Sequence, residues 1–562
     1  MTKTASSEGG RLAKVKAKAR ELLTLRGEAR EDYLVNSDNI GELVPLLPPD
    51  ELLFTLRSAA RENALEIISC ATAEQLISLF DLELWDEDIL SGERTAYWLL
   101  FLADMPEKSL VRWLRKLESP ELTILLAPNV TAALADEDGD PPELEGCITF
   151  TLDGTYYFIA QEKLADAAKR LLSLLLRDFP ETFKSVLETL LMGFDPEKEE
   201  EAFQMRSVRI AELGYVSFGE AQSIYEAVAP AAIYNLPHRT APLDVVEHLA
   251  PASYLLTTGE ENVSFAQLLE YFNDTPEGAV IYSQLATLTH KVIAADGLDV
   301  GDEESYYTAG SKVTGYLSIA LATLNGLDEA KMRETLYTHW IENIFRVGWW
   351  RVQSAAKAAR RLLNEGWPQR KMERLLLIDE PLISTMSGLL FKRPKYFHVT
   401  KRDERYRDFY SLSEVEEAER GVAKIDFIGR YLLKAIDFSL GNLNKAVTDI
   451  ADENMKGSTV FNTGLLNAAL GNGFIFAPIP RAKVGEALDK LWLEGSKPKR
   501  VKGEFTLAAI NWSDGFMEMT MEEKGYLSDF LGDAVALLED EYGHLPPGET
   551  PDPRFLRGIW IK

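Results

Sequence analysis

Apolar residues recur at intervals of three and four along most of the chain, a spacing typical of amphipathic helices. Two apolar runs in the C-terminal half, residues 471–480 and 503–512, fit strands or buried loops instead. The pattern therefore predicts a mainly α fold with minor β or irregular segments near the C-terminus. Six residue pairs have the capping-box spacing with which helices begin: Asn39 and Glu42, Thr72 and Gln75, Ser217 and Glu220, Ser264 and Gln267, Ser411 and Glu414, and Thr520 and Glu523.

A loose repeat marks the N-terminal part of the chain. The sequences LPPDEL, ATAEQL and LESPEL, at residues 47–52, 71–76 and 117–122, each open an amphipathic helix. Short helices of this kind predict a solenoid-like region, because each pair needs its neighbours to bury its apolar stripe. An ordinary bundle of short helices remains the alternative. Residues 40–127 resemble the N-terminal helical superhelix of MgtE-type magnesium channels, and this resemblance implies the fold but no metal ligand.

One β-hairpin is expected near residues 148–160. β-forming residues flank Asp153 and Gly154 in the sequence CITFTLDGTYYFIA, and an Asp-Gly pair supplies the positive φ angles of a tight turn. The acids, prolines and glycines before it predict an exposed linker.

Shifts in composition divide the chain into seven segments. We expect a basic amphipathic segment (1–35), a helical-repeat region (36–135), an acidic linker (136–147), a hairpin with helices (148–235), a helical region with a basic face (236–400), a mainly helical region (401–543) and an extended Pro-rich tail (544–562).

The charge balance narrows the choice of partners. Against 60 Lys and Arg there are 89 Asp and Glu, so the 562 residues carry a formal charge of −29, which opposes non-specific binding to nucleic acid. The two cysteines, Cys70 and Cys147, form no disulfide framework or zinc motif, and no apolar run reaches the ~20 residues of a membrane span. These features predict an acidic cytoplasmic protein without a membrane span.

Three segments carry a broader resemblance. Residues 80–88 (FDLELWDED), 197–228 and 342–363 (ENIFRVGWWRVQSAAKAARRLL) resemble an uncharacterised family of bacterial cytosolic proteins, known as a domain of unknown function, over about residues 35–500. The resemblance implies no activity, cofactor or catalytic residue.

Acidic clusters are candidate cation sites. Asp136, Asp138 and Asp140 follow the opening of a calcium loop, but Pro141 and Cys147 replace the glycine and glutamate that such a loop requires. A second cluster contains Asp296, Asp299 and Asp302. A solvated acidic loop is the alternative for both.

The six histidines of the chain are candidate acid–base groups or metal ligands: His238, His248, His290, His339, His398 and His544. Asp244 and His248, and His339 and Glu342, have spacings that place each pair on one helix face. An enzyme would need one histidine to meet a carboxylate and a third polar group in a pocket.

The most distinctive feature is a basic island between Arg346 and Arg407. It holds 15 Lys and Arg against six Asp and Glu, a local charge of +9, which leaves −38 on the other 500 residues. On a helix, Lys357, Arg360 and Arg361 form one stripe beside Trp350, opposite an apolar face. The predicted basic face comprises Arg346, Trp350, Lys357, Arg360, Arg361, Lys395, Arg402 and Arg405.

Two roles for this face remain open: it docks on the chain's own acidic residues, or it binds an acidic protein partner, with nucleic acid disfavoured. Because Walker, GxSxG, HExxH and dinucleotide-binding motifs are missing, we predict a non-catalytic scaffold or adaptor without a cofactor. The alternatives are a divalent-cation-responsive regulator and an enzyme of unrecognised class. The sequence does not predict an oligomeric state.

Overall fold

The computed structural model describes residues 18–19, 21–86, 88–135, 144–193, 196–239, 263–272, 275–400, 405–441, 455–496, 498–546 and 557–562. Helices make up 68% and strands 6% of the structure, which confirms the prediction of a mainly α fold. The chain forms two compact units, Met1–Val347 and Gly348–Lys562. The boundary falls within α19 (Ile341–Glu365).

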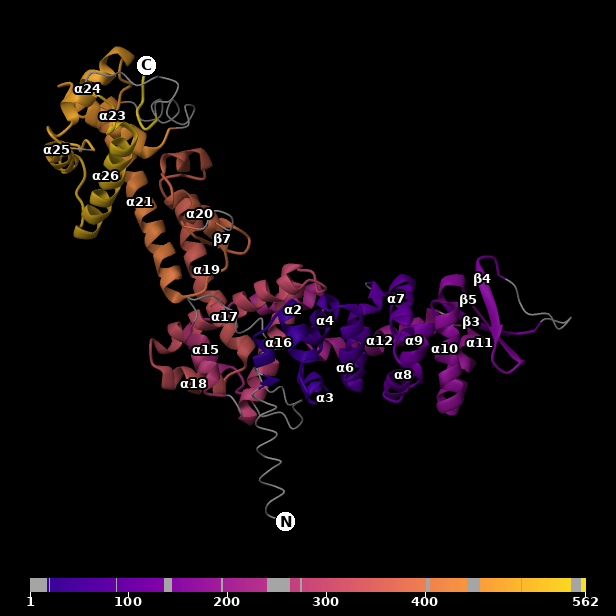
Figure 1. The fold of residues 1–562 in the computed structure, drawn as a ribbon. Coiled ribbons are helices and arrows are strands. Elements are labelled where there is room, and N and C mark those ends of the chain that lie inside the picture. The colour runs from indigo at the N-terminus through magenta and orange to yellow at the C-terminus, as the bar shows by residue number, and fades with distance from the viewer. Residues whose placement is uncertain are drawn as a thin grey trace. The chain divides into compact units, whose positions relative to one another are not determined.

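Short helices of the first unit lie side by side and pack on their neighbours in the sequence (Figure 1). Their core includes Phe80, whose ring meets Trp98 and Trp113 edge to face at centroid distances of 5.7 and 5.9 Å. Ala19 and Leu22, near the start of the described chain, are buried in the same core. The elements are α2 (Gly27–Val35), α3 (Ile40–Leu43), η1 (Val44–Leu46), α4 (Pro49–Ser58), α5 (Arg61–Ser69), α6 (Ala73–Glu83), β1 (Trp85–Asp86), β2 (Ile89–Leu90), α7 (Gly92–Ala103), α8 (Glu107–Leu114) and α9 (Ser119–Leu126).

The predicted hairpin is present and belongs to a three-stranded antiparallel sheet. β4 (Cys147–Thr151) and β5 (Tyr156–Gln161) are joined through Gly154, whose φ is +78°. β3 (Val130–Leu134) pairs with the other edge of β5, giving the order β3–β5–β4. This third strand corrects the expectation that residues 36–135 are helical to their end. The side chains of Val130 and Ala132, on one side of β3, are buried in the core.

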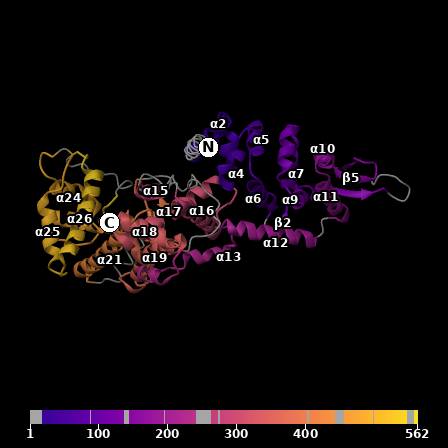
Figure 2. The same cartoon turned by 90° about the horizontal axis from the view of Figure 1, so that it is seen from below.

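The rest of the first unit is helical. α12 runs beside α6 and β2 (Figure 2), where Arg209 forms a two-pronged ion pair with Asp81, both N–O distances being 2.7 Å. The elements are α10 (Glu162–Asp178), α11 (Pro180–Met192), α12 (Pro196–Glu212), α13 (Phe218–Ala221), η2 (Gln222–Tyr225), η3 (Pro230–Asn235), α15 (Val263–Glu270), α16 (Pro276–Asp296), α17 (Glu303–Asn325) and α18 (Glu329–Thr338).

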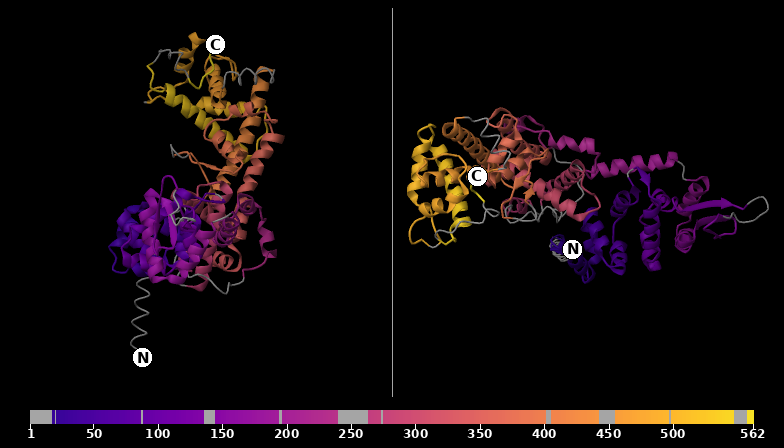
Figure 3. Two further views of the ribbon diagram at one scale, coloured as in Figure 1. Left: turned by 90° about the vertical axis from the view of Figure 1, so that its right-hand side faces the viewer. Right: turned by 90° about the horizontal axis from the view of Figure 1, so that it is seen from above.

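The second unit is built around two long helices, α21 and α26, which contact each other and whose orange and yellow ribbons lie in one group in both views of Figure 3. Its elements after α19 are η5 (Met372–Leu377), α20 (Leu382–Leu390), β6 (Tyr396–Phe397), β7 (Tyr406–Arg407), α21 (Leu412–Leu440), α23 (Gly457–Ala469), η6 (Arg481–Lys483), α24 (Val484–Leu491), α25 (Gly503–Ser513) and α26 (Met521–Tyr542).

Local capping chemistry explains several helix starts. Thr72 and Thr520 form complete capping boxes with the residues three positions later. The side chains of Ser217 and Ser411 also cap their helices. At Asn39 the side chain makes no capping hydrogen bond.

Two sequence predictions were wrong. α15 begins at Val263, so Ser264 already lies inside the helix. Residues 503–513 form α25 rather than a strand or loop, and Ala509 and Ser513 on one of its faces are buried. Most of the Pro-rich run of the predicted surface tail, residues 547–556, lies outside the described residues. After it, Ile559 is buried and Ile561 forms a parallel bridge with Ile479.

Candidate functional site

α19 separates its apolar and basic residues as the helical pattern predicts. Ile344, Val352 and Ala359 are fully buried, whereas Lys357 and Arg361 are exposed. Trp350, which the pattern assigns to the basic stripe, is half-buried.

Several cations of the basic island are paired within their own unit. Arg346, in the first unit, donates to the backbone and side-chain oxygens of Glu226 at 2.7 and 2.9 Å. In the second unit, Lys395 lies 2.8 Å from a carboxylate oxygen of Asp408, a buried residue. These cations therefore dock on the chain's own acids.

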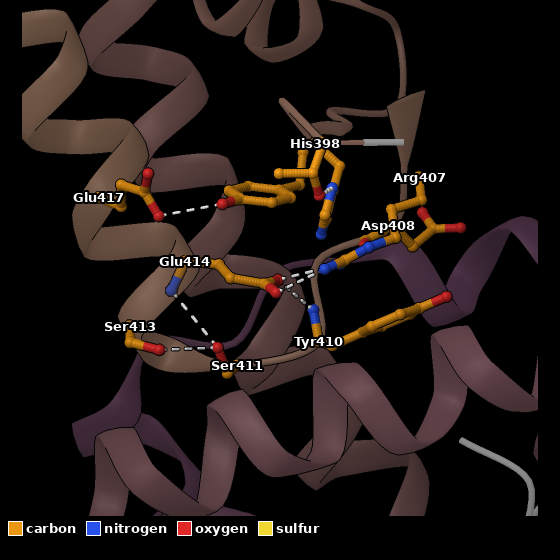
Figure 4. Close-up of polar contacts among 10 residues, drawn as sticks. His398, Arg407, Asp408, Tyr410, Ser411, Ser413, Glu414 and Glu417 are labelled. Carbon is orange, nitrogen blue, oxygen red and sulfur yellow. Dashed lines mark hydrogen bonds and ion pairs between the residues drawn. The ribbon is translucent and has the colours of Figure 1, made fainter. Parts of the chain in front are cut away.

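Arg407, a further cation of the basic island, is part of a buried cluster and does not belong to the surface (Figure 4). Arg407 Nη2 donates to Glu414 Oε1 at 2.7 Å, and Nη1 donates to Oε2 at 3.2 Å. The guanidinium lies 4.9 and 4.1 Å from the ring centroids of Tyr396 and Tyr410. The Tyr396 hydroxyl donates to Glu417 Oε2 at 2.9 Å. This cluster fixes the β6–β7 hairpin on the first turns of α21.

Other cations of the basic island lie beside exposed aromatic rings in the second unit. Arg360 Nη2 reaches the Phe391 carbonyl oxygen at 3.5 Å, and the Phe391 and Tyr406 rings are 5.2 Å apart. We call this set the basic–aromatic surface: Lys357, Arg360, Arg361, Phe391, Lys392, Arg405 and Tyr406, of which Arg360 alone is half-buried. Arg402 lies outside the described residues.

A cleft of about 690 Å³ opens elsewhere in the second unit. One stripe of α21, from Glu417 to Ile428, and one stripe of α26, from Tyr526 to Leu537, form two of its walls. The loop before α20, the β6 strand and the start of α23 complete it. Lys424 on α21 and Asp529 on α26 are paired at 2.6 Å.

Asp379 lies at the end of the cleft near α23. Its carboxylate accepts hydrogen bonds from the Ser458 backbone N–H at 2.9 Å and from the Ser458 hydroxyl at 2.5 Å. Burial raises the pKa of Asp379 above its ordinary value, although the Ser458 hydrogen bonds and the nearby Lys456 act in the opposite direction. Lys456 Nζ itself donates to the Ile378 carbonyl oxygen at 3.3 Å.

The similarity to a known protein family extends over nearly the whole chain. A model of the family of unknown function DUF6178 matches residues 6–562. The chain belongs to this family. No curated protein and no solved structure matches it.

In this DUF6178 protein the acidic candidates have separate partners. Asp296 is paired with Lys312, a buried residue, at 2.6 Å. Asp299 accepts from the Gly301 N–H, and Asp302 caps α17. Within the described ranges, no group of three or more His, Cys, Asp or Glu side chains is arranged to hold a metal ion. Asp136, Asp138 and Asp140 lie outside these ranges.

The histidine candidates likewise do not pair with the carboxylates that the sequence spacing suggests. His339 Nδ1 is buried, and burial lowers the pKa of His339, with His238 acting in the same direction. Its predicted partner Glu342 pairs with Lys291 at 2.8 Å. Asp244 and His248 lie outside the described residues.

His290 meets a carboxylate, but in the core rather than in a pocket. Its Nε2 lies 3.3 Å from Asp50 Oδ2, its Nδ1 contacts the Leu213 carbonyl oxygen, and its ring stacks on Tyr215. Nε2 therefore connects α16 to α4, and Nδ1 connects α16 to the segment that follows α12. No sequence spacing or motif signals these contacts, because the partners lie 240 and 77 residues away along the chain.

Sequence reasoning also missed the cleft. Its residues come from segments between Asp379 and Leu537 that only the tertiary fold brings together. The signal that was available is the matching pattern on α21 and α26, where small and apolar residues alternate with charges every three or four positions.

None of the described helices is long and apolar enough to cross a membrane.

Proposed function

We propose that the protein is a non-catalytic scaffold or adaptor that binds an acidic protein partner through the basic–aromatic surface. The observation that carries this proposal is the exposure of Lys357 and Arg361 on α19, next to Arg360, which reaches the Phe391 backbone. Exposed cations attract the carboxylates of an acidic partner, and the accessible aromatic rings beside them offer apolar contact area to the rest of that partner.

The pairing of neighbouring cations supports a selective role for those left exposed. Arg351, on the same helix, is held by Glu419 through two contacts of 2.5 and 2.7 Å. The chain has a large excess of acids, yet Lys357, Lys392 and Arg405 form no ion pair with any residue that the structure describes. Arg361 on this surface pairs with Glu365, but their side chains are 80% and 70% exposed. The cations without such a partner suit an external acidic partner.

A photo-crosslinking residue at Phe391 tests this proposal in cells that express the full chain. We expect it to capture a defined partner through an acidic segment. The variant Lys357→Glu, Arg360→Glu, Arg361→Glu should lose capture but remain folded, since exposed helix charges affect stability only slightly. Raised salt should weaken capture in the same way, because screening shortens the Debye length below ~10 Å above 0.1 M salt.

The matched control reverses three exposed lysines of the first unit, Lys108→Glu, Lys163→Glu and Lys169→Glu, which changes the net charge by the same amount. It should keep full capture. Equal loss in both variants would attribute the effect to net charge. Unfolding of the α19 variant alone would assign the surface a structural role. Either result would contradict the proposal.

A further inference from the structure

The cleft of the second unit has the size of a small-molecule site. Its volume of about 690 Å³ lies within the range of roughly 300–1,000 Å³ that encloses most of the surface of a small ligand. All of its lining residues belong to the second unit, and none belongs to the basic–aromatic surface.

Apolar side chains form much of the lining. Phe530 on α26 is buried, Ile428 on α21 is buried, and Leu537 remains 37% exposed in the cleft wall. Pro381 and Leu382 come from the opposite side, at the start of α20. A ligand with an apolar body would therefore remove apolar surface from water on several sides, which favours binding.

The charges that line the cleft do not balance. Lys424 is neutralised by Asp529. Arg420 lies one helical turn after Glu417. Lys456 is close enough to Asp379 for its charge to lower the pKa of that carboxyl. The three cations thus have acidic neighbours. The carboxylates in the lining are Asp379, Glu380, Glu417, Asp529 and Asp533.

Glu380 and Asp533 are the two acids left over. Both are exposed at the cleft, and neither forms an ion pair with any residue in the described part of the chain. Asp533 also lies near enough to Asp379 for their charges to interact. The excess negative charge is therefore near the Asp379 end, beside the apolar walls formed by Pro381 and Phe530.

We propose that this cleft binds a small organic cation, a primary ammonium attached to an apolar body. Glu380 and Asp533 attract and orient the ammonium group, and the apolar walls enclose the body. The charge is opposite to that of the basic–aromatic surface, so this site is independent of the adaptor function proposed above. A carboxylate ligand directed at Arg420 or Lys456 is the competing outcome, and the experiment separates the two.

Isothermal titration calorimetry of the full chain with three probes tests the proposal. Hexylammonium carries the charge and the body, ethylammonium carries the charge with little body, and hexanoate carries a similar body with the opposite charge. We expect one saturable site for hexylammonium. Ethylammonium and hexanoate should each bind at least tenfold more weakly.

Two variants then locate the site. Glu380→Gln with Asp533→Asn should weaken hexylammonium binding at least tenfold and leave the melting temperature unchanged, because both side chains are exposed. The control, Glu373→Gln with Asp540→Asn, removes two exposed carboxylates outside the cleft lining and should bind as the wild type does.

Four results would overturn the proposal. Equal binding of ethylammonium would indicate general attraction to an acidic protein. Equal or tighter binding of hexanoate would assign the site to an anion. Absence of saturable hexylammonium binding, or full binding by the Glu380→Gln, Asp533→Asn variant, would show that these carboxylates do not form the site. Loss of partner capture at the basic–aromatic surface would leave the cation site unaffected.

Discussion

The indole ring of Trp367 lies directly on the α-carbon of Gly429 in the middle of α21. A Cβ at this position would overlap the Cε2, Cζ2 and Cδ2 atoms of the ring. Trp367 is held there by its Nε1–H, which donates to the Ile425 carbonyl oxygen at 3.2 Å. Glycine at residue 429 is therefore a packing requirement rather than a turn signal, since its backbone is helical.

Gly429→Ala should lower the free energy of unfolding by roughly 1–3 kcal/mol, the cost of overpacking a rigid contact. Gly421→Ala, on the same helix, is the control. Its Cβ would meet Thr385 Cγ2 at 3.4 Å and Leu382 Cδ2 at 3.8 Å, which are ordinary contacts, and alanine favours the helix by about 0.5–1 kcal/mol. Urea denaturation measures both. Equal stability of the two variants would contradict the packing argument.

Breaking the Arg407–Glu414 pair should be costly because both side chains are at most 10% exposed. Glu414→Gln leaves the guanidinium buried without its counter-charge, which typically costs about 3–5 kcal/mol. Glu365→Gln removes the partner of Arg361 in a pair whose side chains are 80% and 70% exposed, so its denaturation midpoint should hardly move. The prediction fails if the two variants unfold at similar urea concentrations.

The sequence predicted what local chemistry determines. The faces of α19 follow from helical periodicity, so Val352 is buried and Lys357 exposed as expected. The Asp153-Gly154 turn follows from the φ angles that glycine allows. The run at residues 503–513 was ambiguous because short apolar segments fit both helices and strands.

Long-range partners were beyond such reasoning. Glu226 is 120 residues from Arg346, and Glu419 is 68 residues from Arg351. No spacing rule connects residues so far apart, so whether a cation is paired or exposed depends on the tertiary fold. The cleft was missed for the same reason, since Asp379, Lys424 and Asp533 come from three separate elements.

Lys312 should stabilise the folded protein by supplying the counter-charge of Asp296. Its side chain is 1% exposed and its Nζ lies 2.6 Å from Asp296 Oδ2, while the Tyr225 hydroxyl donates to Oδ1 at 2.8 Å. Lys312→Met should destabilise the protein by about 3–5 kcal/mol, because a partly buried carboxylate loses its counter-charge. Adding Asp296→Asn to this variant should recover part of the loss.

Millimolar Mg²⁺ or Ca²⁺ should leave the melting temperature of the wild type unchanged, because a ligand stabilises a protein only by binding its folded state and Asp296 already has two partners. Differential scanning fluorimetry with and without the cation checks this. A rise in melting temperature that disappears in Asp136→Asn, Asp138→Asn would instead locate a cation site in the acidic linker.

Asp379 should make stability depend on pH in a defined direction. Burial raises its pKa in the folded protein above the ordinary value of 3.8, so the folded state retains a proton that the unfolded state has lost. As pH rises from the unfolded pKa through the folded pKa, this carboxyl therefore lowers the free energy of unfolding.

Asparagine does not titrate, and Asp379→Asn should keep a hydrogen bond to Ser458. The wild type should thus lose stability relative to Asp379→Asn as pH rises from the unfolded pKa towards the raised pKa of the folded state. Urea denaturation of both proteins across this range removes the effects of other titrating groups, which are common to the two. A constant difference would show that the carboxyl does not titrate there, and a difference that grows in favour of the wild type would show that the Ser458 hydrogen bonds outweigh burial.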